Sequence, residues 1–120
     1  APYRRALDSR QSTALRPGQE LRVDVSALVP AGAIAAAVNV TATEPQTAGW
    51  LAAYPCGAWG GTSSVNFAAG QTVATHSTVP VTSGAFCVRS STTTHVVVDV
   101  GSAFVNGQGS TFTLMLPRRS

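Results

Sequence analysis

The side chains best suited to chemistry are three aromatic residues close together in the sequence, Trp50, Tyr54 and Trp59. In an extended strand Trp50 and Tyr54 lie on one face, because their spacing is even. Trp59 follows in a glycine-rich loop, and Asn66 comes shortly after it. Aromatic rings stack on the apolar C–H faces of sugars, while amides bind the hydroxyl groups. The four residues therefore suggest a shallow glycan-binding surface; burial of Trp50 and Tyr54 in the core is the alternative.

Catalytic chemistry has little support in the sequence. A hydrolase needs a nucleophile beside a base, or paired carboxylates in a cleft. The chain has five acidic residues and two histidines, His76 and His95, and both histidines fall among polar residues that indicate exposed or edge positions. The stretch Gly-Thr-Ser-Ser-Val at 61–65 lacks the second glycine of a nucleophile elbow. We predict that the protein is not an enzyme.

Metal and cofactor motifs are missing from the sequence. It contains no C-x-x-C, no H-E-x-x-H and no cluster of cysteine with histidine, which are the patterns that zinc sites use. The composition still allows calcium held by backbone carbonyls with Asp or Asn. We predict no metal site and no cofactor.

Two cysteines, Cys56 and Cys87, are present in a chain rich in serine and threonine and without lysine. This pattern predicts one structural disulfide formed in an oxidising compartment, with two buried free thiols as the alternative. Closing a loop of about thirty residues would stabilise the fold by roughly 3 to 4 kcal/mol. We therefore expect an extracellular or cell-surface location.

Three charged residues suggest a structural ion pair. Asp99 lies among the valines of the stretch 97–100, where a carboxylate must face water or be paired. An unpaired buried charge would cost several kcal/mol. We interpret Arg10 as a bridge to Asp99 or to Asp8 that holds the first strand to the sheet, and we favour this over a ligand site.

The elements that position these residues are β-strands. Apolar and polar residues alternate from Glu20 to Leu28, and again from Ala36 to Thr43. The alanines at 31–37 are interpreted as a loop or one helical turn, because alanine favours helix and Gly32 interrupts the run. Turn residues recur about every ten residues, which is typical of a sandwich or jelly roll. Further strands are predicted at 64–67, 73–81, 85–89, 95–100 and 112–116.

These observations predict one domain over residues 1–120 with an all-β fold. We expect an antiparallel β-sandwich, jelly-roll or immunoglobulin-like, with about eight or nine strands and one disulfide. Charged residues make up 11%, the net charge is +3, and much of the positive charge lies near the two ends. A nucleic-acid partner is therefore not expected. No apolar run is long enough to span a membrane, so membrane insertion of this segment is not expected either.

Several short motifs occur in a characteristic order. They are Leu7-Asp8-Ser9-Arg10, Pro17-Gly18, Ala37-Val38-Asn39-Val40-Thr41, Gly49-Trp50-Leu51, Tyr54-Pro55-Cys56-Gly57, Ser63-Ser64-Val65-Asn66-Phe67 and Val97-Val98-Asp99-Val100. In this order they resemble a module of secreted actinobacterial proteins that occurs beside amidases, proteases and glycoside hydrolases and in cell-wall-associated chains. The resemblance covers most of residues 7–104. It departs at Ser9, where the family has Thr, and at 101–104, where the family tends to end in Gly-Tyr-Phe. It implies a secreted β-sandwich accessory domain and carries no catalytic residues.

The sequence supports two functions. The first is a non-catalytic secreted or surface module that binds cell-wall or extracellular polysaccharide through Trp59, Tyr54, Trp50 and Asn66, which requires exposed rings. The alternative is a structural or protein–protein interaction domain of a larger secreted or membrane-anchored protein, which pairs with a partner or neighbouring domain through strand edges. Protease inhibition through the loop 57–62 ranks last, because a glycine-rich loop is poorly preorganised.

Overall fold

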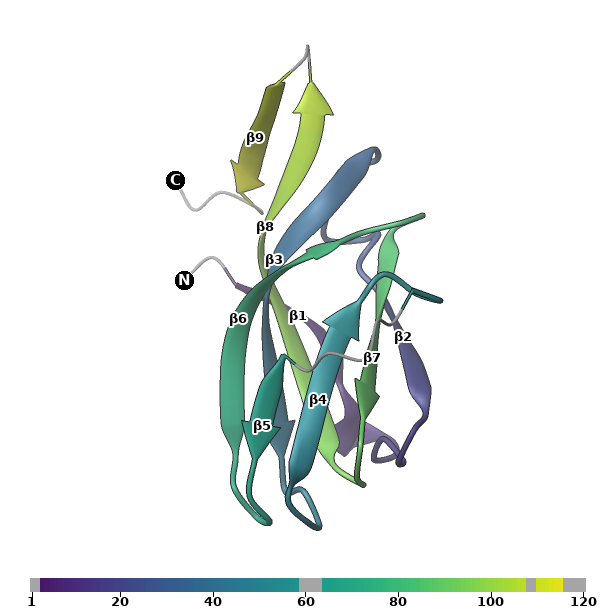
Figure 1. Ribbon diagram of the computed structural model, residues 1–120. Helices are drawn as coiled ribbons and strands as arrows, with labels where there is room; N and C mark the ends of the chain where they lie inside the picture. Colours follow the sequence, from purple (N-terminus) through teal and green to yellow (C-terminus); the bar gives the residue numbers. More distant parts are fainter. Residues whose placement is uncertain (1–2, 59–63, 108–109, 116–120) are drawn as a thin grey trace.

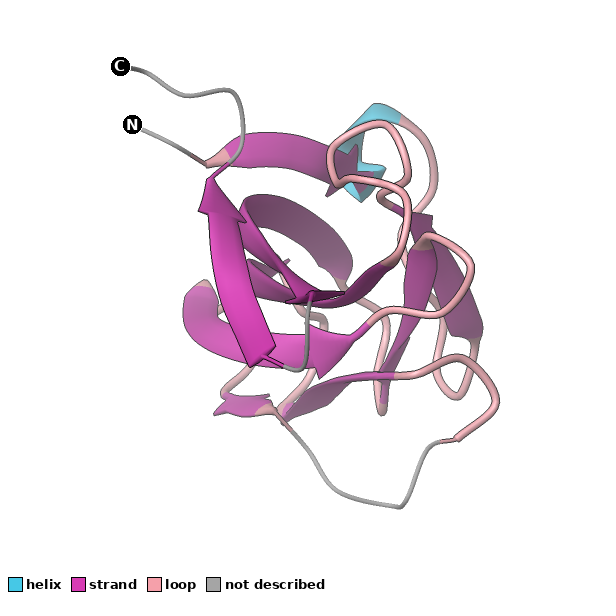
Figure 2. Ribbon diagram, turned by 90° about the horizontal axis from the view of Figure 1, so that it is seen from above, coloured by secondary structure: helices cyan, strands magenta, loops and turns pink. Residues whose placement is uncertain are grey.

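The computed structural model describes residues 3–58, 64–107 and 110–115, with side chains described up to Val105. These residues form nine strands and one short 3-10 helix, η1, which is cyan in Figure 2. The predicted all-β antiparallel sandwich with a Cys56–Cys87 disulfide is confirmed. The elements are β1 (Arg4–Asp8), η1 (Ser9–Gln11), β2 (Glu20–Asp24), β3 (Ala33–Thr43), β4 (Gly49–Tyr54), β5 (Val65–Phe67), β6 (Val73–Pro80), β7 (Ala85–Ser90), β8 (His95–Gly107) and β9 (Ser110–Met115).

The strands form two sheets that pack face to face. The four-stranded sheet has the order β2-β7-β4-β5, and the five-stranded sheet has the order β1-β8-β3-β6 with β9 added to β8 (Figure 1). Among the described strands only β4–β5 and β8–β9 are consecutive neighbours within one sheet. Each of the other connections leads to a strand of the opposite sheet.

Strand β8 organises the five-stranded sheet. It pairs with β3 along one edge from His95 to Val105. On its other edge it pairs first with β1, through residues 97–100, and then with β9, through residues 102–107. The β8–β9 hairpin consequently projects beyond the four-stranded sheet (Figure 1).

The core lies between the sheets and follows the alternation of the sequence. Val38 and Val40 of β3 are fully buried, while the intervening Asn39 lies on the outer face. β2 repeats the pattern, with Val23 buried between the exposed residues Arg22 and Asp24. The facing strands β7 and β8 contribute Phe86, Val88, Val96, Val98 and Val100. Strands are thus confirmed within both predicted segments. Neighbouring residues along each strand face opposite sides, so apolar residues at every second position all face the core.

Residues 33–37 differ from the expectation of a loop or helical turn. They form the beginning of β3, where Ala35 pairs with Pro80 on one side and with Phe104 on the other. Backbone pairing along both edges outweighs the weak helix preference of alanine.

Strand β2 is shorter than the predicted segment and ends at Asp24 rather than Leu28. The amides of Leu28 and Val29 both donate to the carbonyl of Val25, so the chain turns there.

The connection from β6 to β7 is a tight turn between the sheets. Ser83 and Gly84 both have positive φ angles, 54° and 75°, and Thr82 and Ala85 exchange two backbone hydrogen bonds. This geometry is a type I′ turn, which favours glycine. At Gly84 a Cβ would also lie 2.8 Å from the Cβ of Ser26, so a side chain has no room.

Candidate functional site

Strand β4 presents the predicted aromatic residues on the outer face of the four-stranded sheet. Leu51 faces the core, so Trp50, Ala52 and Tyr54 face the opposite way. Ala52, Tyr54 and Cys87 form a second, small apolar cluster, and Trp50 packs against it. The outer face is therefore not uniformly polar: it carries an apolar strip along β4 and β7.

Tyr54 is part of the packing of this face. Its side chain is buried, with the residue 6% exposed, and its hydroxyl donates to Glu20 Oε1 at 2.7 Å. Arg89 Nε donates to the same hydroxyl oxygen at 3.3 Å. Burial raises the pKa of Tyr54, so the hydroxyl stays protonated and donates to Glu20. Tyr54 therefore links three strands and offers no open ring face for stacking.

Trp50 and Asn66 are the described members of the predicted set that reach the surface. They are opposite each other in the β4–β5 register, with Trp50 half-buried and Asn66 exposed. Ser91 Oγ accepts a hydrogen bond from the Trp50 amide at 2.9 Å, which fixes the backbone at this position. The structure thus places an indole ring directly beside an exposed amide. Trp59 lies outside the described residues.

The disulfide braces the same face. Cys87 pairs with Tyr54 across β4 and β7, and its bond to Cys56 ties the chain that follows β4 back to β7. The prediction of a structural disulfide is confirmed, and no free cysteine is found among the described residues.

The charged residues form a cluster around Asp8. Arg10 donates to Asp8 through Nε and Nη2, each at 2.8 Å, and its backbone amide donates at 3.0 Å. Of the two partners considered for Arg10, the structure shows Asp8. Asp99 is paired by Arg5 instead, at 2.6 Å, and Arg5 also donates to Asp8 at 3.0 Å. Arg5, for which no partner was predicted, thus forms the ion pair between the paired strands β1 and β8.

The acid dependence of stability follows from this cluster. The hydrogen bond from the Arg10 side chain lowers the pKa of Asp8 from 3.8 to about 2. A lowered folded-state pKa contributes stability above the unfolded pKa, and this contribution is lost as the pH falls from about 4 through about 2. We expect Asp8→Asn to be less stable than the wild type at neutral pH, with a difference that shrinks over this interval. Urea unfolding at a series of pH values measures it, and a difference that does not vary with pH would contradict the assignment.

A second polar contact pairs Ser9 with His95. Ser9 Oγ lies 3.0 Å from His95 Nδ1, a geometry in which an imidazole could activate a hydroxyl. Ser9 is only 2% exposed, however, and its Oγ also accepts a hydrogen bond from the Val96 amide at 2.8 Å. A substrate has no path to a hydroxyl so enclosed. Ser9 therefore ties η1 to β8, a role that its position in the Leu-Asp-Ser-Arg motif could have indicated.

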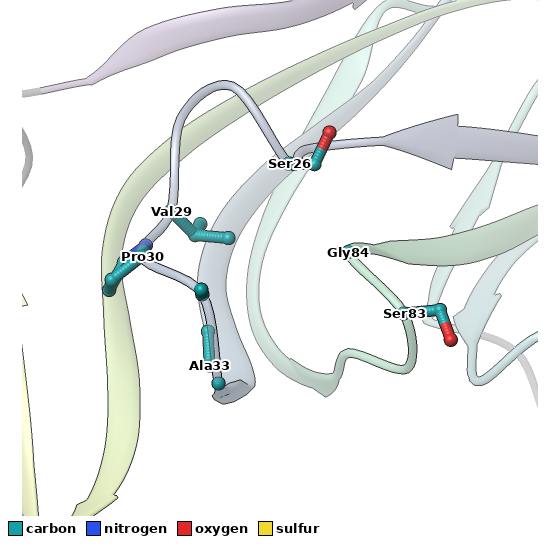
Figure 3. Close-up of a pocket in the computed structure, with 8 residues that line it drawn as sticks. Ser26, Val29, Pro30, Ala33, Ser83 and Gly84 are labelled. Carbon is teal, nitrogen blue, oxygen red and sulfur yellow. The ribbon is translucent and has the colours of Figure 1, made fainter.

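A cavity of about 380 Å³ lies between the β2–β3 connection and the β6–β7 turn (Figure 3). Val29 and Pro30 contribute apolar surface, Ser26 and Ser83 contribute hydroxyls, and no titratable side chain is among its lining residues. The cavity can hold a small apolar group, but it has no base to activate either serine.

The described part of the chain has neither a metal-binding cluster nor a membrane-spanning helix. Within it, no three side chains of His, Cys, Asp or Glu are grouped so that they could hold a metal ion. The same residues include no helix with the length and apolar character needed to cross a membrane. Comparison with known proteins finds no significant match to any family model, curated protein or solved structure. The resemblance to the actinobacterial module therefore stays a prediction from its motifs.

Proposed function

We propose that the protein is a non-catalytic extracellular module that binds cell-wall or other extracellular polysaccharide through the outer face of its four-stranded sheet. The observation that carries this proposal is the pair formed by Trp50 and Asn66. The indole supplies an apolar surface for the C–H face of a sugar ring, and the adjacent amide supplies both a donor and an acceptor for hydroxyl groups.

The surroundings of this pair support binding without large rearrangement. The hydrogen bonds between Tyr54, Glu20 and Arg89 hold β2, β7 and β4 together on the same face. The disulfide ties the adjoining chain to β7. A rigid, open sheet face suits an extended polymer, and one half-buried ring gives weak binding that a repeating polymer strengthens by offering many sites.

A structural or protein-interaction role is the second candidate. Ile34 is 46% exposed, and Ala33 before it lines the cavity in Figure 3. β2 and β6 also lie at sheet edges, where a partner strand could pair. This role requires a partner chain or a neighbouring domain and makes no use of Trp50.

Co-sedimentation of the oxidised protein with insoluble cell walls, purified peptidoglycan and arabinogalactan tests the proposal. We expect the wild type to be retained and Trp50→Ala to bind about tenfold more weakly, because loss of the stacking surface removes about 1.4 kcal/mol. Asn66→Ala should also weaken binding, and its exposed side chain makes loss of folding a small concern. Ile34→Ala is the matched control, since it removes an exposed apolar side chain elsewhere.

Circular dichroism of each variant separates loss of binding from loss of folding. Failure of the folded wild type to sediment with any of the polymers would overturn the proposal and favour the protein-interaction role.

A further inference from the structure

The outer face of the five-stranded sheet carries a row of polar side chains. Asn39 of β3 is paired with Asp99 of β8 on one side and with His76 of β6 on the other. Arg5 of β1 is opposite Asp99 and binds it at 2.6 Å. The buried valines next to these positions face the core, so all four polar residues face outward. Four neighbouring strands thus contribute one polar residue each to a single row.

The side-chain oxygen of Asn39 in this row has no hydrogen-bond partner among the described residues. Asn39 Oδ1 is shielded from solvent and accepts no hydrogen bond from the described residues. The neighbouring Asp99 carboxylate is itself an acceptor when ionised, so it has no hydrogen to offer. A buried acceptor without a donor is destabilising, and such groups in a folded protein call for an explanation.

Tyr3 lies beside this amide. Its ring rests on Gly101, where a Cβ would come within 2.7 Å of the ring, and its hydroxyl lies 3.2 Å from His76 Nδ1. Gly101 is between residues that pair with Ala37 and Val38, whereas His76 pairs with Asn39. Tyr3 and His76 therefore meet above β3, next to Asn39. Tyr3 is 40% exposed and is one of the exposed large hydrophobic residues of the described chain.

These groups define the chemistry of a ligand. The orphaned oxygen requires a donor, and the exposed ring accommodates an apolar C–H face. The charges of Arg5 and Asp99 balance each other, which gives no preference for an anion or a cation. A neutral sugar residue has hydroxyl donors, hydroxyl acceptors and C–H faces, and so satisfies all three conditions.

We infer that Tyr3, Asn39 and His76 form a second sugar-binding site, on the sheet opposite Trp50. A sugar hydroxyl donates to Asn39 Oδ1 when the Tyr3–His76 contact opens, and the Tyr3 ring then packs on the sugar. The inference takes its ligand class from the proposed function, but it uses none of the same residues. A module with sites on both outer faces can join two polysaccharide chains.

The test is an NMR titration of the full chain with chitotetraose and, separately, with arabinogalactan oligosaccharides. In the wild type we expect shifts at the Asn39 side-chain amide, at His76 and at the Gly101 backbone amide. Asn39→Ala and Tyr3→Ala should each raise the Kd measured at this site at least tenfold. Thr41→Val, which removes a polar group at the next outward position of β3, is the control and should leave the Kd unchanged.

The outcomes separate the two sites. Asn39→Ala should fold, because Oδ1 has no hydrogen bond to lose. Shifts confined to the Trp50 face would overturn the second site and leave the proposed function standing. Shifts confined to Asn39 and its neighbours would support the second site and count against the Trp50 face. If neither sugar shifts the resonances of either face, both the second site and the proposed function would be overturned.

Discussion

Replacing Cys56 and Cys87 together by alanine is expected to lower the free energy of unfolding by roughly 3 to 4 kcal/mol. The two cysteines are separated by 31 positions, so their bond removes much of the loop entropy of the unfolded chain. For a domain of this size each kcal/mol corresponds to about 4 °C in Tm, which gives a fall of about 14 °C. Thermal and urea unfolding of the oxidised wild type and the double variant measure the difference.

The wild type treated with a reductant is the matched control, because it keeps both sulfur atoms. Reduced wild type and double variant should unfold at similar urea concentrations, well below the oxidised wild type. A loss of less than about 1 kcal/mol would show that the unfolded chain keeps these segments close even without the bond.

Phe86→Ala is expected to lower the free energy of unfolding by about 3 to 5 kcal/mol. Phe86 is 0% exposed, is the second residue of β7 and belongs to the same core cluster as the buried valines of the opposite sheet. Removal of the ring loses its burial and leaves a cavity that the two paired sheets cannot easily close. Chemical denaturation gives the magnitude.

Phe104→Ala removes the same ring from a half-buried position on β8, in the part of the strand that pairs with β9. We expect it to lose less than about 2 kcal/mol, because less apolar area is buried there. Equal losses in the two variants would contradict the assignment of the core to the space between the sheets.

The outer faces of the two sheets could be predicted only in part. Even spacing correctly places Trp50 and Tyr54 on one face of a strand. Tyr54 is more buried than Trp50, because the side chains of Glu20 and Arg89 reach it from neighbouring strands and bind its hydroxyl. Burial of a side chain depends on what neighbouring strands place over it, and the spacing of residues within one strand carries no such information.

The cluster around Asp8 likewise combines one contact that local sequence predicts with one that only the fold creates. Local sequence was enough to suggest that Arg10 pairs with a nearby carboxylate, because Asp8 is two residues away. The partner of Asp99 is Arg5, which is 94 residues distant and comes close only because β1 pairs with β8. β1 itself shows no alternation of apolar and polar residues, so its pattern gave no signal for a strand.

By itself, the sequence determined the fold class, the strands with clear alternation and the disulfide, since each depends on residue type and short-range periodicity. Only the tertiary structure decided which aromatic ring is buried, that residues 33–37 are a strand, and that Tyr3 meets His76 beside Asn39. The physical reason is that strand order and register bring together residues far apart in the chain. Those contacts, rather than local pattern, set exposure and hydrogen bonding on both outer faces.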